Sequence, residues 1–339
     1  MNTSSGDKID STHAFAPIIR ILGKGPGASR DLDWDEAYDA MKMILAGDVE
    51  QLQLGAFLCL MRYKKETPIE LAAFVQAARD SIKSPDDITI DLDWPSYADR
   101  HRQLPWFLLA ALLLAENGTR VFMHGIEGES EGLMPTRQAL NHLGVAEKTN
   151  WDAVRKSLDD SNFAYLGLEC FSKPLNNLFA LRPLLGLRSP VNSLARELNP
   201  LNADTQLQGV FHPTYCDPHR QAGLLLKQPN LAVFKGGGGE IQANPYKPIK
   251  VSGIQGGISF DETWNATLPA PAYRWRDEEL DPARISALWQ GRLDFEPAQI
   301  AITETVAIAL KLMGKARNQS EARNQSKAMW DARDKNRFS

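Results

Sequence analysis

The fold is decided by Leu207-Gln208-Gly209-Val210-Phe211, a short apolar stretch that a predicted helix at 217–227 separates from a second one, Leu231-Ala232-Val233-Phe234. Two such stretches on either side of a helix predict a strand–helix–strand unit. Three further candidate strands lie upstream, at Ile88-Thr89-Ile90, Arg120-Val121-Phe122-Met123 and Ala164-Tyr165-Leu166-Gly167. We therefore expect an α/β domain with a mostly parallel central sheet.

Helices are predicted between these strands, at 104–116, 132–143, 174–184, 190–197 and 217–227. The first contains the longest apolar run of the chain, from Leu104 to Ala115, which is too short to cross the hydrocarbon layer of a membrane. We expect it to be a buried helix and the protein to have no membrane segment. Residues 1–12 contain no apolar core with basic flanks, so we expect no secretory signal and a cytoplasmic location.

The N-terminal part has a helical pattern from Asp33 to Ser84. Within it, Thr67-Pro68-Ile69-Glu70 is a helix start, with a Thr cap, Pro in the first turn and Glu completing a capping box. We expect three packed helices whose apolar faces exceed what one layer can bury, and hence a homodimer. The predicted organisation is an N-terminal extension at 1–32, a helical dimerisation domain at 33–86, an α/β domain at 87–313 and a basic tail at 314–339.

The composition excludes a disordered chain and a small disulfide-stapled module. The chain has 339 residues, of which 43% are hydrophobic and 24% charged, enough for a large core. Its cysteines, Cys59, Cys170 and Cys216, lack the close pairing of metal sites and are expected to be reduced structural thiols. The formal charge is −4, yet the segment 311–339 carries about +5 and repeats Ala-Arg-Asn-Gln-Ser. We expect a solvated, mobile tail; a dedicated nucleic-acid arm is the alternative.

In a parallel sheet, ligands bind beyond the carboxyl ends of the strands. The predicted strands bring Trp94 to Arg102, His124-Gly125, Arg188 and the loop from Lys235 to Glu240 to that edge. The loop contains Gly236-Gly237-Gly238-Gly239, whose backbone N–H groups could close on an anion; a loop that is merely flexible is the alternative. His124 could donate to an anion or transfer a proton, or it could cap a strand–helix turn.

The segment from Gly186 to Pro200 resembles the G-V-R-T-x-x-N-x-L-G-P-L-x-N-P stretch of anthranilate phosphoribosyltransferases. It keeps the Gly, Arg, Asn, first Leu and terminal Asn-Pro in register. In the helical part, Ala46 to Thr67 is similar to that family's G-x-V…Q-x-A-F-L…R-x-K-G-E-T region. With His124-Gly125 and Gln206 to Val210, the resemblance covers about residues 33 to 310 and implies the fold of that family.

Three departures from the family's pattern fall where phosphoribosyl pyrophosphate and magnesium are bound. The G-T-G-G-D turn after the first strand is replaced by Asp93 to Arg102, which contains a proline and no glycine. K-H-G-N-R becomes Met123-His124-Gly125-Ile126-Glu127, which exchanges positive charge for a carboxylate. The Asp-Glu pair that helps to hold magnesium matches Gly239-Glu240, so Glu240 is the one candidate metal ligand where a hard cation prefers several oxygens.

Two further segments, Ser96-Tyr97-x-x-Arg100 and Gly238-Gly239-Glu240-x-x-Ala243-Asn244-Pro245, resemble the YbiB-like branch of this superfamily. That resemblance implies a fold shared with pyrimidine nucleoside phosphorylases, homodimers formed through the helical domain, and a link to nucleic-acid binding in place of tryptophan synthesis. Arg188 matches the arginine that contacts the aromatic acid in the enzymes, and its fork suits a carboxylate or a phosphate equally. A structural ion pair is the alternative for Arg188.

Aromatic and basic residues alternate after the first predicted strand. Trp94 and Tyr97 precede Arg100, His101 and Arg102, a composition that can stack bases and neutralise phosphates. A solvated loop whose aromatic residues seal the core is the alternative.

Three hypotheses of function follow. The first is a homologue with a degenerate phosphoribosyl pyrophosphate site that binds nucleic acid non-specifically as a dimer, without a cofactor. The second is an active glycosyl or phosphoribosyl transferase with an altered, phosphate-bearing substrate and Mg²⁺; the third is a dimeric scaffold with neither activity. A small anion would contact His124, Gly125, Arg188, Lys235, Gly236, Gly237, Gly238 and Gly239, and nucleic acid would contact Arg100, Arg102, Arg188, Arg196, Lys227 and Lys235.

Overall fold

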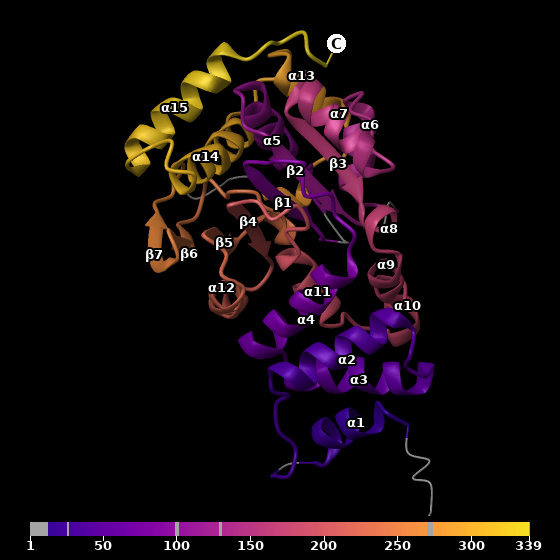
Figure 1. Cartoon of the computed structure of the whole chain (residues 1–339). Helices are drawn as coiled ribbons and strands as arrows, with labels where there is room; N and C mark the ends of the chain where they lie inside the picture. Colours follow the sequence, from indigo (N-terminus) through magenta and orange to yellow (C-terminus); the bar gives the residue numbers. More distant parts are fainter. Residues whose placement is uncertain (1–12, 26, 99–101, 129–130, 270–273, 339) are drawn as a thin grey trace, which may run out of the picture.

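A seven-stranded sheet forms the centre of the larger domain (Figure 1). The computed structural model describes residues 13–25, 27–98, 102–128, 131–269 and 274–338. The strand order is β3-β2-β1-β4-β5-β6-β7; the first five strands in this order are parallel, and β6 and β7 are antiparallel additions. The predicted fold, a helical bundle beside an α/β domain with a mostly parallel sheet, is confirmed. The strands are β1 (Leu92–Ser96), β2 (Val121–Gly125), β3 (Phe163–Gly167), β4 (Thr205–Val210), β5 (Asn230–Lys235), β6 (Ile249–Gln255) and β7 (Ile258–Trp264).

The first strand begins later in the chain than predicted. Ile88-Thr89-Ile90 precedes β1, and Ile88 is buried in a small core cluster, which explains its apolar character. Asp93 and Trp94, expected in a loop, lie inside the strand. Because Pro95 has no N–H to donate, β1 cannot form a complete ladder on both sides: its pairing with β2 continues to Ser96, whereas its pairing with β4 ends at Asp93.

Helices cover both faces of the sheet (Figure 1). One face packs against α5 (Phe107–Glu116) and α14 (Glu296–Leu312). The other packs against α7 (Trp151–Ser161) and α12 (Cys216–Leu225). The predicted buried helix at 104–116 is thus confirmed as α5, and no described helix is long and apolar enough to span a bilayer. Shorter elements of this domain are α6 (Thr136–His142), α13 (Ala283–Trp289) and the 3₁₀ turns η1 (Ala195–Glu197), η2 (Pro213–Tyr215), η3 (Gly237–Gly239) and η4 (Trp275–Asp277).

The helical domain is larger than the predicted segment 33–86. Besides α2 (Trp34–Ala46), α3 (Gln51–Lys64) and α4 (Pro68–Ser81), it includes α1 (Ala16–Gly23). Phe15, just before α1, is buried edge-to-face against Phe57 of α3, so the predicted extension at 1–32 contributes to this core. Residues from the middle of the chain complete the same apolar cluster, in or beside α8 (Leu168–Phe171), α9 (Lys173–Phe179), α10 (Arg182–Leu185) and α11 (Val191–Leu194).

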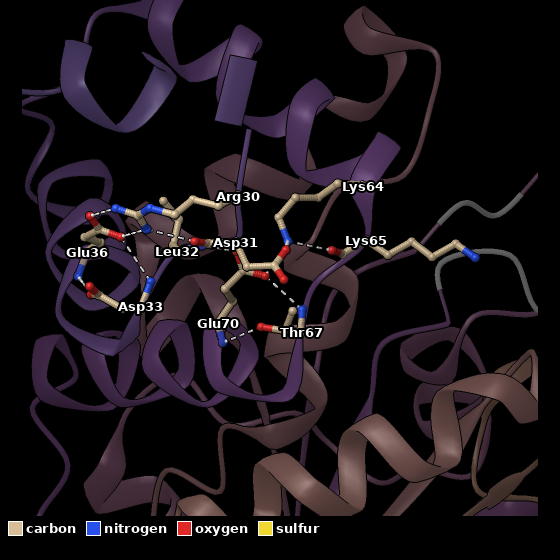
Figure 2. A network of polar contacts seen from close by, with 9 residues as sticks. All are labelled: Arg30, Asp31, Leu32, Asp33, Glu36, Lys64, Lys65, Thr67 and Glu70. Carbon is tan, nitrogen blue, oxygen red and sulfur yellow. Dashed lines mark hydrogen bonds and ion pairs between the residues drawn. The ribbon is translucent and has the colours of Figure 1, made fainter. Parts of the chain in front are cut away.

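The buried carboxylate of Glu70 forms hydrogen bonds that connect separate segments of the helical domain (Figure 2). Glu70, fully buried in the first turn of α4, accepts a hydrogen bond from Lys64 Nζ at 2.6 Å. It also accepts the backbone N–H groups of Leu32 and Thr67, each at 2.8 Å. The Thr67 hydroxyl in turn accepts the Glu70 N–H at 3.2 Å, which confirms the predicted capping box. The network fixes the last turn of α3, and with it the position of Arg62, against the rest of the domain.

The C-terminal segment is an ordered helix, which differs from the predicted mobile tail. In α15 (Gln319–Ala332), Ala322, Ser326 and Trp330 recur at every fourth position and form a buried face against α14. Trp330 packs edge-to-face on Trp289, and the Arg333 guanidinium carbon lies 3.7 Å from the centroid of the Trp330 ring. The ion pairs Lys311–Glu262, Arg323–Glu304 and Arg337–Glu116 offset part of the segment's charge, and Arg317–Glu321 is a pair within the segment.

Candidate functional site

An arginine-lined pocket opens where the helical domain meets the carboxyl ends of the strands. Its walls come from the last turn of α3, the segment around α11 and η1, and the segment that joins β4 to α12. The cavity has a volume of about 100 Å³. Basic and aromatic side chains line it: Arg62, Arg188, Arg196, Phe211, His212 and Tyr215. The structure thus brings the predicted Arg188 and Arg196 together.

The pocket carries positive charge on fixed side chains. Arg196 donates from Nε to the Gly209 carbonyl at 2.9 Å and from a terminal nitrogen to the Asn192 carbonyl. Burial lowers the pKa of Arg196 to about 10, so the group stays protonated at neutral pH. Burial, followed by the charge of Arg188, lowers the pKa of Arg182 beside the pocket. Guanidinium groups that destabilise one another in this way are stabilised by an anion.

His219 forms the floor of the pocket and begins a buried chain of hydrogen bonds. Its Nδ1 lies 2.7 Å from a Glu197 carboxylate oxygen and 2.9 Å from the Gln208 amide oxygen. Since both partners are acceptors, Nδ1 carries the proton. The Gln208 amide nitrogen donates to Gln206 at 2.8 Å, and Gln206 donates to Asp93 at 2.7 Å. The chain therefore runs from the pocket to the centre of the sheet.

His124 closes the same chain from the other side of Asp93. Its Nε2 lies 3.1 Å from Asp93 Oδ1, and its Nδ1 lies 2.7 Å from the Tyr97 hydroxyl. Burial raises the pKa of Tyr97, so the hydroxyl keeps its proton and donates to Nδ1, while Nε2–H donates to Asp93. A Cβ on Gly125 would lie 2.1 Å from the Ser96 carbonyl oxygen, so this glycine is needed for close packing. His124 and Gly125, predicted to contact an anion, are buried and instead join the ends of β1 and β2.

The glycine loop folds back on itself, which differs from the predicted anion-holding loop. The backbone N–H groups of residues 236, 237, 239 and 240 donate to backbone carbonyl groups at 2.9–3.3 Å. A Cβ on Gly236 would lie 1.6 Å from the Glu240 carbonyl oxygen, so this close approach requires glycine. Four backbone N–H groups that could have bound an anion therefore stabilise the turn by hydrogen bonds to carbonyl groups.

The surroundings of Glu240, the one predicted metal ligand, do not fit Mg²⁺. Its carboxyl is buried, and Oε1 accepts the Ala98 N–H at 2.6 Å. Oε2 is buried without a hydrogen-bond partner among the described residues. Burial raises the pKa of Glu240 to about 7, against the opposing charge of Arg196, so the group is partly protonated at neutral pH. Residues 13–338, apart from their undescribed gaps, contain no cluster of three His, Cys, Asp or Glu side chains suited to a metal.

The remaining predicted cations are divided between the two edges of the sheet. Lys235 is exposed at the end of β5, and Arg102 is exposed on the chain between β1 and α5. Lys227 follows α12 and lies at the opposite edge, where Gln228 donates to backbone carbonyls just before β4. The reason is topological, because a helix between two parallel strands returns the chain to their amino ends. Arg100 lies outside the described residues.

The aromatic residues beside the pocket are not the predicted ones. Trp94 and Tyr97 are buried, which favours the alternative in which they seal the core. Phe211, by contrast, is 51% exposed at the pocket, next to His212. A signal was present, since Phe211 is the last residue of a predicted strand and His212 follows it. Arg62 lies in the R-x-K-G-E-T-like segment, which supported the family resemblance but was not predicted to bind a ligand.

Comparison with known proteins agrees with this geometry. Residues 16–82 match the helical bundle domain of a glycosyl transferase family. The chain is 27% identical over 239 residues to the uncharacterized protein YbiB of Escherichia coli (strain K12), an alignment that covers 69% of this chain and 74% of YbiB. It is 28% identical over 289 residues to an anthranilate phosphoribosyltransferase of Gluconobacter oxydans (strain 621H), covering 82% and 78% of the two chains.

Solved structures share the whole fold. The anthranilate phosphoribosyltransferase of Thermus thermophilus has a TM-score of 0.76 at 20% identity over 94% of both chains. The Saccharomyces cerevisiae enzyme in complex with PRPP and Mg has a TM-score of 0.76 at 16% identity over 96% of both chains. The resemblance to the anthranilate phosphoribosyltransferase and YbiB-like superfamily is confirmed. The match of the helical bundle model from residue 16 onward is consistent with α1 as part of the helical domain of this phosphoribosyltransferase-like chain.

Proposed function

We propose that this phosphoribosyltransferase-like protein binds nucleic acid through the arginine-lined pocket and does not transfer a phosphoribosyl group from phosphoribosyl pyrophosphate. The observation that carries the proposal is a contrast at the carboxyl edge of the sheet. The ends of β1 and β2 are closed by buried side chains, whereas the pocket beside β4 stays open and positively charged.

The closed part supports loss of the pyrophosphate site. The Tyr97 side chain, stacked on Phe179 and bonded to His124, lies directly after β1, where the family's glycine turn holds the pyrophosphate. The Glu240 carboxyl accepts the Ala98 N–H, and the N–H groups of residues 236, 237, 239 and 240 donate to backbone carbonyls within or beside the glycine loop. A polyanion placed there would meet a buried carboxyl and few available donors, so binding would be unfavourable.

The open part supports binding of backbone phosphates. Arg62 and Arg188 come from segments far apart in the sequence, and both line one small cavity. Guanidinium groups bind phosphate oxygens in pairs and contribute most of the sequence-independent affinity for nucleic acid. Because the chain has a formal charge of −4, attraction to a polyanion requires such a local cluster.

Purified protein is expected to release no pyrophosphate above background from phosphoribosyl pyrophosphate, Mg²⁺ and anthranilate, while it binds a labelled oligonucleotide at low salt. The anthranilate phosphoribosyltransferase of Gluconobacter oxydans, run in parallel, is the positive control for the transfer assay. Steady formation of the phosphoribosylated product by the protein would contradict the proposal, and so would the absence of oligonucleotide binding at low salt.

The pocket also favours a second candidate function, a transferase with an altered acceptor. Arg188 occupies the position of the family arginine that contacts an aromatic acid, and an arginine fork binds a carboxylate as well as a phosphate. This candidate requires pyrophosphate release with some acceptor other than anthranilate. Failure of oligonucleotide binding together with such release would favour it over the first.

We also propose that the protein forms a homodimer through α3. Leu52 and Tyr63 are 86% and 90% exposed, and Cys59 is exposed between them at the i+7 position from Leu52. These positions share one face of the helix, and a second copy would bury the same stripe across a twofold axis. A dimer would also present two arginine pockets to one strand of nucleic acid, which raises the effective affinity.

Replacing Leu52 and Tyr63 together by Asp is expected to weaken self-association by more than about a hundredfold, because like charges would face each other across the axis. Ile258→Asp, at a 74% exposed position on β7, is the matched control and should leave association unchanged. Light scattering at micromolar concentration measures the effect. A monomeric wild-type protein at that concentration would rule out this dimer.

A further inference from the structure

Phe211 is a large aromatic side chain held in solvent at the entrance of the pocket. It is 51% exposed, and the adjacent His212 ring stands nearly perpendicular to it, with 4.8 Å between centroids and 79° between planes. Both residues line the arginine pocket. An exposed aromatic face beside guanidinium groups is the combination that proteins use to stack a base and neutralise its phosphate.

The glycine run holds this aromatic residue in place. Gly239, whose φ of 94° favours glycine, packs beside Phe211: a Cβ on it would be in van der Waals contact, at 3.5 Å, with both the backbone nitrogen and the Cβ of Phe211. The preceding amides fix the turn by hydrogen bonds to the backbone. The loop therefore supports the backbone and Cβ of Phe211, and this support favours one position of the residue at the pocket before a ligand binds.

The size of the cavity favours a polymer over a small ligand. Its volume of about 100 Å³ is well below the range of about 300–1,000 Å³ for sites that enclose a whole small molecule. One phosphate group fits such a cavity, while the atoms attached to it must lie outside. Phe211 lies at the open side of the pocket, where the atoms attached to a bound phosphate would leave the cavity.

We infer, on the basis of the proposed function, that the pocket binds single-stranded nucleic acid, with one backbone phosphate between Arg62 and Arg188 and one unpaired base stacked on Phe211. Stacking on Phe211 requires a base face that is free of its neighbours. In a duplex both faces of each base are covered by adjacent base pairs, so only the phosphate contact is available there. The site therefore prefers single strands.

Fluorescence anisotropy with a labelled oligothymidine and a labelled duplex of equal length tests the inference. Phe211→Ala is expected to weaken single-strand binding about tenfold and to leave duplex binding unchanged, since only the stacked base is lost. Phe211→Trp should restore single-strand binding. Ile258→Ala, another exposed apolar position, is the control and should bind both probes as the wild type does.

The outcomes separate this inference from the proposed function. Binding of both probes with no effect of Phe211→Ala, or with an equal loss for strand and duplex, overturns the stacking site and leaves nucleic-acid binding intact. No binding of either probe at low salt overturns both. Because Phe211 is half exposed, Phe211→Ala should unfold at the wild-type temperature, and this measurement excludes loss of fold as the cause.

Discussion

A chain that ends at Gly314 is expected to lose more than about 4 kcal/mol of unfolding free energy, because the deleted segment includes a large core residue and uncovers α14. Trp330 is 5% exposed and packs against Trp289, and Trp289 Nε1 also donates to the Asp334 carbonyl at 2.7 Å. Removal of a buried Trp side chain alone costs about 3–5 kcal/mol. The truncation removes the rest of α15 as well.

Urea unfolding curves of the intact chain, the truncated chain and two substitutions measure this effect. Trp330→Ala should reproduce most of the loss, whereas Lys327→Gln, at an exposed position of the same helix, should change the midpoint little. A truncated chain with the wild-type midpoint would show that α15 adds nothing to the core. If truncation destabilises the fold, it cannot be used to test whether the charge of the segment 311–339 contributes to nucleic-acid binding, because both charge and stability would change.

The parallel strands could be predicted because burial makes each of them a short apolar run. β2, β3 and β5 are covered on both faces, so their sequences show the signal without interruption. The β6–β7 hairpin escaped prediction because β7 is mostly exposed and lacks such a run. Its turn, Gly256-Gly257, has φ values of 57° and 77° and was the available signal.

The C-terminal helix illustrates a different limit. The six-residue repeat suggested a mobile, basic segment, yet the helix has an apolar face whose period is four residues rather than six. Three basic residues of the segment 311–339 pair with carboxylates elsewhere in the chain, namely Glu262, Glu304 and Glu116. Pairing across such distances in the sequence cannot be derived from a local count of charges.

The sequence predicted where residues lie along the carboxyl edge of the sheet better than it predicted which of them could bind a ligand. Arg188 and Arg196 reached the pocket as the topology implied. His124 was predicted at the same edge of the sheet, but both of its ring nitrogens form hydrogen bonds, one with Asp93 and one with Tyr97. The register of β1 on β2 brings these partners together. Whether a residue is available to a ligand depends on such partners.

Single-strand binding is expected to weaken about a hundredfold when the salt concentration rises from about 50 to about 200 mM, if about five phosphates are contacted. The described cations that could supply these contacts lie in the pocket or at the same edge of the sheet: Arg62, Arg102, Arg188, Arg196 and Lys235. Each contact contributes about 0.7 to the slope of log affinity against log salt for a single strand. The slope therefore counts phosphates and does not depend on which bases are present.

The decisive comparison is Arg62→Ala/Arg188→Ala against Lys83→Gln/Lys156→Gln, which removes the same charge from exposed positions outside the pocket. The pocket variant should lower the slope by about 1.4, the value for two lost contacts, and the control should leave it unchanged. Equal slopes for the two variants would mean that binding reflects overall charge and not the pocket. Since the chain is acidic overall, overall charge would repel the strand, and a pocket-specific loss is the outcome that the geometry predicts.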